Sequence, residues 1–241
     1  MAELQTIKLE QRTSQKAHGA FDSGKYKRRD KAKCRNGQAN GYACENVDML
    51  DFMSHEEMRS DTREGNDVWG WTAPNGREFA AVGQTDGTAF VEVRRDGSLQ
   101  YLGRLPTQTV PSLWRDMKVI GSHVYIGSEA RGHGLQIFDM KKLLTAQPRS
   151  PKNYSVENDL TGWFSFGGRD NSHNIVAHEE TNMIYAVGTD RTLSCRAGLY
   201  MVDVSDPANP TSPGCVSEDG YVHDAQCVIY NGKHPSSPSN L

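Results

Sequence analysis

The stretch that decides the fold is NIVAHEETNMIYAVGTDRTLSCRAGLYMVDV, residues 174–204. It holds three apolar runs of strand length, and the polar segments between them are rich in Gly, Asn and Asp. Runs of this length bounded by turn-forming residues are typical of β-strands. The stretch therefore predicts three neighbouring strands of one antiparallel sheet.

The same order of segments occurs twice earlier in the chain. EFAAVG and GTAFVEV (78–83 and 87–93), and then HVYIGS and HGLQIFDM (123–128 and 133–140), parallel MIYAVG and AGLYMVDV. Each unit begins near a polar residue that marks the same position of the repeat, and we call these the register residues: Asp67, Asp116, Asn174 and Asp224. They are separated by 49, 58 and 50 residues. Four short strands in a repeat of about fifty residues are typical of a β-propeller blade. The sequence predicts an all-β fold, a partial β-propeller of four-stranded antiparallel blades with about three and a half blades present.

The repeat also sets the expected organisation of the chain. A polar N-terminal arm and a cysteine loop are expected over residues 1–43, the propeller repeats over 44–232, and a polar tail over 233–241. Before the repeats, Ser54 and Glu57 have the spacing of a capping box, so a short helix or turn is expected at 47–58. The irregular stretch 141–171 is expected to be an excursion over one face or an extra edge strand. The units are expected near 65–110, 111–160, 170–218 and 220–232.

Composition and charge exclude several classes of protein. The 241 residues are 24% charged and 36% hydrophobic, with 23 Gly and 10 Pro, which favours a globular, turn-rich protein. A net charge of −3 gives no reason to expect a nucleic-acid partner. The basic run at 25–33 is interpreted as a solvated tail, with a nucleic-acid contact or a processing site as the alternatives. No stretch approaches the roughly 18 apolar residues of a transmembrane segment, and the N-terminus lacks the apolar core of a signal peptide.

Five cysteines bear on the compartment. Cys34 and Cys44 bound a polar, Gly-rich loop that a disulfide could close, and Cys195 and Cys215 flank a strand-like segment and could also pair. These pairings need an oxidising compartment, and they leave Cys227 alone. The alternative is five free thiols in a cytosolic protein. No CxxC spacing of a zinc site or a redox motif occurs.

The candidate site is the polar set that opens each unit. In a propeller the innermost strands line the central channel, so these residues would converge at the axis. Carboxylate and amide oxygens suit Ca²⁺, and imidazole suits transition metals. A ring that binds an ion or a small polar ligand is one hypothesis, and hydrogen bonding between neighbouring blades is the other. The candidate residues, without an assigned metal, are Asp67, Asp116, His173, Asn174, His223 and Asp224.

A second group lies in SEARGHG, residues 128–134. Glu129, Arg131 and His133 could form a small acid–base group, and an ordinary surface turn is the alternative. No nucleophile elbow, phosphate loop, dinucleotide-binding glycine pattern or HExxH motif occurs in the chain.

Several long strings resemble one known family. NDVWGW, LWRDMKV, SEARGHGLQIFDM, SHNIVAHEETNMIYAVGT, GLYMVDVSDPANP and SEDGYVHDAQCVIYNG are similar to segments of the LVIVD-repeat proteins called the choice-of-anchor B family. The resemblance runs from about residue 44 to 232. It implies a secreted or cell-surface β-propeller with no assigned enzymatic activity.

The resemblance also implies differences. Members of the family carry a signal peptide and continue through further blades. In the family, the cysteine that matches Cys227 has a partner downstream. These features are not found in this sequence, so we expect the chain to be a truncated product. The function expected is a non-enzymatic extracellular scaffold that binds a protein or glycan ligand, with no cofactor beyond a divalent cation such as Ca²⁺. The alternative function is a metal-dependent, hydrolase-like enzyme with its site at the propeller axis.

Overall fold

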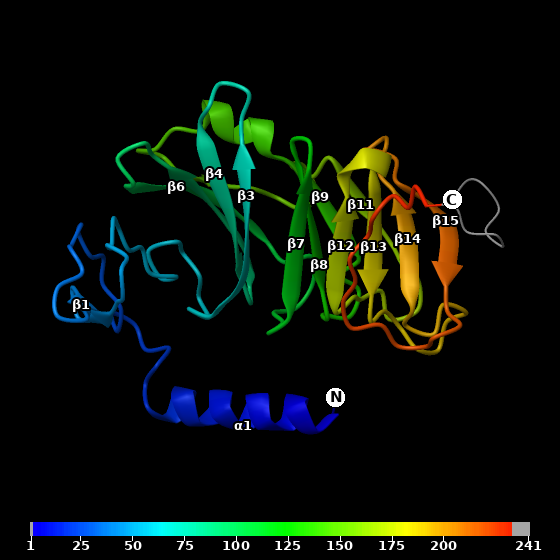
Figure 1. The fold of residues 1–241 in the computed structure, drawn as a ribbon, viewed down its shortest axis with the longest axis horizontal. Helices are drawn as coiled ribbons and strands as arrows, with labels where there is room; N and C mark the ends of the chain where they lie inside the picture. The colour runs from blue at the N-terminus through cyan, green and yellow to red at the C-terminus, as the bar shows by residue number, and fades with distance from the viewer. Residues whose placement is uncertain (1, 233–241) are drawn as a thin grey trace.

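The computed structural model describes residues 2–232, and its main feature is three sheets that follow one another along the chain (Figure 1). Each contains four antiparallel strands in chain order. The first sheet is β3 (Gly65–Thr72), β4 (Glu78–Gln84), β5 (Gly87–Val93) and β6 (Leu99–Pro106). The second is β7 (Arg115–Ile120), β8 (His123–Ser128), β9 (Leu135–Asp139) and β11 (Gly162–Phe164). The third is β12 (Asn174–His178), β13 (Met183–Val187), β14 (Leu199–Asp203) and β15 (Thr211–Val216).

The first strands of the three sheets lie side by side. Strand β3 contacts β7, and β7 contacts β12, as the centre of Figure 1 shows. The expected antiparallel four-stranded sheets are therefore confirmed. Within residues 2–232 the three sheets do not close on one another, so closure into a propeller is not shown.

Tight turns join the strands where the sequence places Gly after Asn or Asp. Gly76 between β3 and β4 has a φ of 78°, and Gly97 between β5 and β6 has a φ of 82°. These left-handed conformations carry little strain for glycine. Asn-Gly and Asp-Gly pairs favour tight turns of this kind between strands.

Two apolar layers hold the sheets together. Between the first and second sheets, Phe90 stacks on Phe138 with ring centroids 4.5 Å apart, and Tyr154 meets Phe138 edge-on at 4.8 Å. Between the second and third sheets, Ile137 and Ile175 belong to one fully buried cluster. Each sheet therefore buries a face against the next, and this burial of apolar area is the main stabilising contribution.

The glycine that ends the second strand of a unit allows this close packing. A Cβ atom on Gly83 would lie 2.8 Å from Met117 Cε of the second sheet. At the equivalent position, a Cβ atom on Gly127 would lie 2.9 Å from Ile175 Cγ2 of the third sheet. Both distances are shorter than ordinary contacts of a Cβ atom, so a side chain at either position would require its neighbours to move.

The helix or turn expected at 47–58 is present as a turn, in which Ser54 and Glu57 make the reciprocal capping-box bonds. Two other expectations need correction. Residues 220–232 form no strand, because no described strand pairs with them. The outer strand of the second sheet, β11, lies beyond the expected boundary at 160. The predicted tail at 233–241 lies outside the described residues.

The stretch 141–171 does provide an extra edge strand. After a 3₁₀ helix, η1 (Met140–Thr145), the short strand β10 (Lys152–Asn153) pairs in parallel with β6 of the first sheet. A second 3₁₀ helix, η2 (Glu179–Thr181), joins β12 to β13. The connection from the second sheet therefore returns to the first sheet before it reaches β11.

The N-terminal arm is more ordered than a solvated tail. It contains α1 (Ala2–Ala17) and a two-stranded hairpin, β1 (Gln38–Ala39) with β2 (Tyr42–Ala43). Arg12 of α1 forms a bidentate ion pair with Glu64, next to the start of β3.

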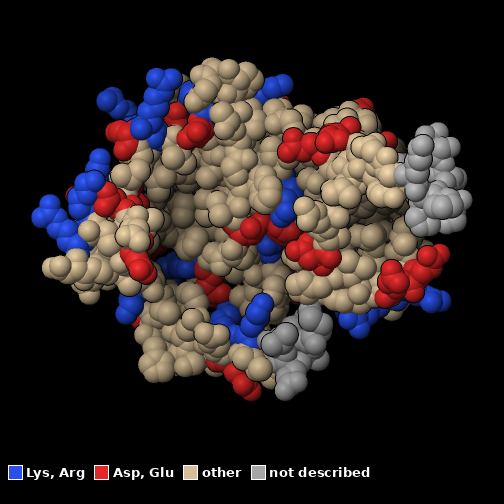
Figure 2. Space-filling view, viewed as in Figure 1, with Lys and Arg blue, Asp and Glu red and all other residues tan. Residues whose placement is uncertain are grey.

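The face of the molecule seen in Figure 1 carries charges of both signs. Figure 2 shows acidic and basic side chains side by side around its hollowed middle. No helix in the described part of the chain has the length and apolar character needed to cross a membrane.

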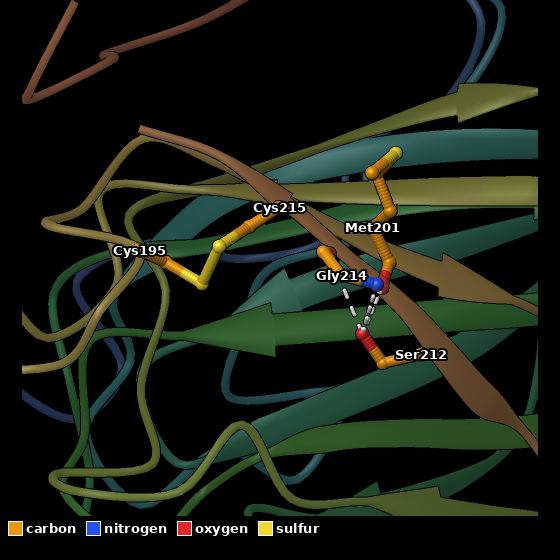
Figure 3. Close-up of a disulfide and its surroundings, with 5 residues drawn as sticks. All are labelled: Cys195, Met201, Ser212, Gly214 and Cys215. Carbon is orange, nitrogen blue, oxygen red and sulfur yellow. Dashed lines mark hydrogen bonds between the residues drawn. A yellow bond between two sulfur atoms is a disulfide. The ribbon is translucent and has the colours of Figure 1, made fainter. Parts of the chain in front are cut away.

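Both predicted disulfides are present. Cys34–Cys44 closes the loop around the N-terminal hairpin. Cys195–Cys215 ties the loop before β14 to the outer strand β15, close to the bonds that Ser212 makes with Met201 and Gly214 (Figure 3). Cys227 is free and half-buried.

Candidate functional site

The register residues bond each sheet to the next. Asp67 Oδ2 of β3 accepts a hydrogen bond from the backbone N–H of Met117 in β7, at 2.9 Å. One unit later, Asp116 Oδ2 of β7 accepts from the backbone N–H of Ile175 in β12, at 2.8 Å. The same position of the repeat therefore carries out the same cross-sheet contact twice. This agrees with the interpretation that the polar set joins neighbouring units.

Asp116 sits in a buried polar cluster. Its Oδ1 accepts from Lys118 Nζ, and the Lys118 ammonium also lies 4.5 Å from the ring centre of Trp69 on β3. Burial, and then the neighbouring Asp67 carboxyl, raise the pKa of Asp116 to about 6. Its ionised form is therefore less favourable in the folded chain than in water.

The polar residues of the third unit form a separate group. His173 Nδ1 donates to Glu129 Oε1, and His173 Nε2 lies 2.8 Å from His223 Nε2. With Nδ1 donating to the carboxylate, a neutral His173 accepts through Nε2 from His223 Nε2. The Asn174 side chain donates to the His223 backbone carbonyl at 3.1 Å. Asp224 is exposed and accepts only from the neighbouring N–H of Ala225 among the bonds described.

The predicted ring is therefore divided into two clusters. Among residues 2–232, no group of three or more His, Cys, Asp or Glu side chains is placed to hold a metal ion. Ca²⁺ requires six to eight oxygen ligands, whereas Asp67 Oδ2 and both carboxylate oxygens of Asp116 already accept from N–H donors. The residues present do not fit a Ca²⁺ site.

The SEARGHG group is also divided. Glu129 bonds to His173, as described above, whereas His133 is fully buried. Burial, and then the Arg115 guanidinium, lower the pKa of His133 to about 3, so this imidazole is neutral at physiological pH. Sequence spacing placed Glu129 and His133 together, and it gave no signal for the Glu129–His173 pair, which joins residues 44 positions apart.

The clearest cavity lies away from the ring. It has a volume of about 510 Å³ and lies between the N-terminal arm and the start of β3. Its wall combines the aromatic rings of Tyr26, Tyr42 and Phe52 with the ion-paired Arg12 and Glu64. Sequence reasoning missed it, because it took the N-terminal arm for a solvated tail.

Comparisons with known proteins assign no family. No protein-family model matches the chain, and no curated protein matches it significantly.

Proposed function

We propose that this protein is a non-enzymatic β-propeller of the cell exterior that binds a ligand, as its resemblance to the LVIVD-repeat and choice-of-anchor B proteins implies. The three sheets are its blades. The observation in favour is the repeated bond from the register aspartate of one sheet to the backbone of the next, made by Asp67 and again by Asp116. Neighbouring blades of a propeller need such contacts between their innermost strands.

The disulfides support the extracellular location. Two pairs form from the five cysteines, one in the N-terminal arm and one in the third sheet. Such bonds persist in oxidising compartments and are rare in the cytosol.

The cavity beside the N-terminal arm is the proposed ligand site. Ligand sites are concave and mostly apolar, with a few polar groups that fix the orientation of the ligand. Here Tyr26, which is 45% exposed, and Tyr42 offer ring faces, while Arg12 and Glu64 offer charged hydrogen-bonding groups. An oligosaccharide matches this chemistry, because a sugar has an apolar face and a rim of hydroxyls.

We expect Tyr26→Ala to weaken oligosaccharide binding about tenfold or more, because it removes one stacking face of the cavity. The measurement is binding of the whole chain to an oligosaccharide array, followed by titration calorimetry with the best sugar. Tyr230→Ala is the control, since Tyr230 is 67% exposed and lies outside the cavity. Absence of binding to any sugar, or equal losses in both variants, would contradict the proposal.

A hydrolase-like activity is the second candidate. The observation that favours it is the line from Glu129 through His173 to His223, in which a carboxylate orients an imidazole for proton transfer.

We expect His173→Asn to lower the hydrolysis of p-nitrophenyl acetate at least tenfold, because it removes the central imidazole of this line. His178→Asn, five residues further along the chain, is the control, because His178 bonds only locally to Thr181 among the bonds described. Equal rates for the wild type and both variants would rule this candidate out.

A further inference from the structure

Arg115, the first residue of β7, is a buried cation with unused donors. Its side chain is only 4% exposed. One nitrogen, Nη1, donates to Thr107 Oγ1 at 2.9 Å, whereas Nε and Nη2 have no hydrogen-bond partner. Three N–H groups of a buried guanidinium are thus unsatisfied, and this arrangement is strongly unfavourable unless another group meets them.

The Asp86 carboxylate, whose charge acts on Arg115, does not meet them. Asp86 Oδ1 accepts from Arg104 Nη2 at 2.8 Å and from Ser60 Oγ at 2.9 Å, and Asp86 Oδ2 accepts from the N–H of Asp61 at 2.8 Å. Arg104 Nε is itself buried without a partner. The two guanidinium groups and one carboxylate of this cluster leave a net charge of +1.

Two other buried side chains with unpartnered atoms, His133, on which the Arg115 charge acts, and Gln136, are neutral. His133 donates through Nδ1 to the Gly134 carbonyl, so its Nε2 carries a lone pair that has no partner. Gln136 Nε2 donates to the Pro106 carbonyl and to Gln108 Oε1, both at 3.2 Å, and leaves its Oε1 without a partner. Neither group can supply the missing negative charge.

We propose that Arg115 and Arg104 bind one small inorganic anion of the chloride class between the first two sheets. The anion accepts from the free N–H groups of Arg115 and from Arg104 Nε, and it neutralises the excess charge. A water molecule beside it donates to the lone pairs of His133 and Gln136. Water alone would satisfy hydrogen bonds, but it would leave a buried net charge, which is far more costly than a paired one. The site is separate from the proposed sugar cavity and does not depend on it.

The first test is a chloride titration of the whole chain's stability. Sodium chloride replaces sodium gluconate at constant ionic strength, so general screening stays the same while the bulky gluconate stays excluded. Above the dissociation constant, each tenfold rise in chloride should raise the ratio of folded to unfolded protein about tenfold in urea denaturation. A ratio that does not change with chloride would overturn the proposal.

Variants and diffraction locate the site. Arg115→Met should abolish the chloride dependence, whereas Arg149→Met at an exposed position should leave it intact. If Arg115→Met does not fold, crystals of the wild-type protein soaked in sodium bromide decide the question. An anomalous peak within hydrogen-bond distance of Arg115 Nη2 or Nε is expected. A fully ordered water at that position, without anomalous signal, would overturn the assignment.

Discussion

Replacing Asp116 by alanine should lower the free energy of unfolding by about 3 kcal/mol. The substitution leaves the buried N–H of Ile175 unpaired and deprives Lys118 of its carboxylate partner. Removal of one partner from a buried, hydrogen-bonded ion pair has effects of this size. Urea denaturation at pH 7, followed by tryptophan fluorescence, measures the change.

Asp224→Ala is the matched control. Asp224 holds the same place in the repeat but is exposed and makes no bond to another sheet among those described, so we expect a change within about 0.5 kcal/mol. Equal losses from both substitutions would show that the cross-sheet bond does not stabilise the fold.

The same carboxyl should make stability depend on pH. Burial raises the pKa of Asp116 from 3.8 to about 6, so the folded chain binds more protons than the unfolded chain between these two values. Its contribution to the free energy of unfolding therefore decreases as pH rises from about 4 to about 6, by at most about 3 kcal/mol. Asp116→Asn keeps an acceptor for Ile175 but cannot ionise, so this variant should lack that decrease.

Removal of the Cys195–Cys215 disulfide should lower the free energy of unfolding by about 3 kcal/mol. The bond closes a loop of 20 residues, and opening a loop of this length increases the entropy of the unfolded chain by about that amount. The double variant Cys195→Ala and Cys215→Ala avoids placing new hydroxyl groups at the buried Cys195 position. The measurement compares the midpoint of urea denaturation of the oxidised wild-type protein with that of the double variant.

Cys227→Ser serves as the control for the loss of a sulfur atom without the loss of a bond, because Cys227 is free. Its midpoint should stay close to that of the wild type. Reduction of the wild-type protein with dithiothreitol should lower the midpoint at least as far as the double variant does. If reduction leaves the midpoint unchanged, the disulfide does not contribute to stability.

Much of the fold could be predicted from short stretches of sequence. Apolar runs such as those within β8 and β13 have strand length, and Gly after Asn or Asp fixes the turns between strands. The spacing of the register residues predicted the order of the units, and both cysteine pairs were predicted from the loops that they close. These features depend on neighbouring residues, so local patterns are sufficient to find them.

At 47–58 the expected helix or turn is present as a turn, and at 220–232 the expected strand does not form. Ser54 and Glu57 form their capping bonds, but no helix extends from them. Residues 222–228 have the pattern of a strand, but none of the described strands pairs with them. A local pattern states what a segment can form, and tertiary partners decide whether it does so.

The sequence by itself determined that the chain forms short antiparallel strands in a repeating order, with a polar residue at a fixed place in each unit. Only the tertiary structure decided what those polar residues do. In the folded chain, Asp67 and Asp116 accept hydrogen bonds from the backbone of the next sheet, and Glu129 bonds to His173. Arg115 is buried with unsatisfied donors. The physical reason is that hydrogen bonding and desolvation depend on which groups share a buried space. Residues about fifty positions apart meet there only after the sheets have packed.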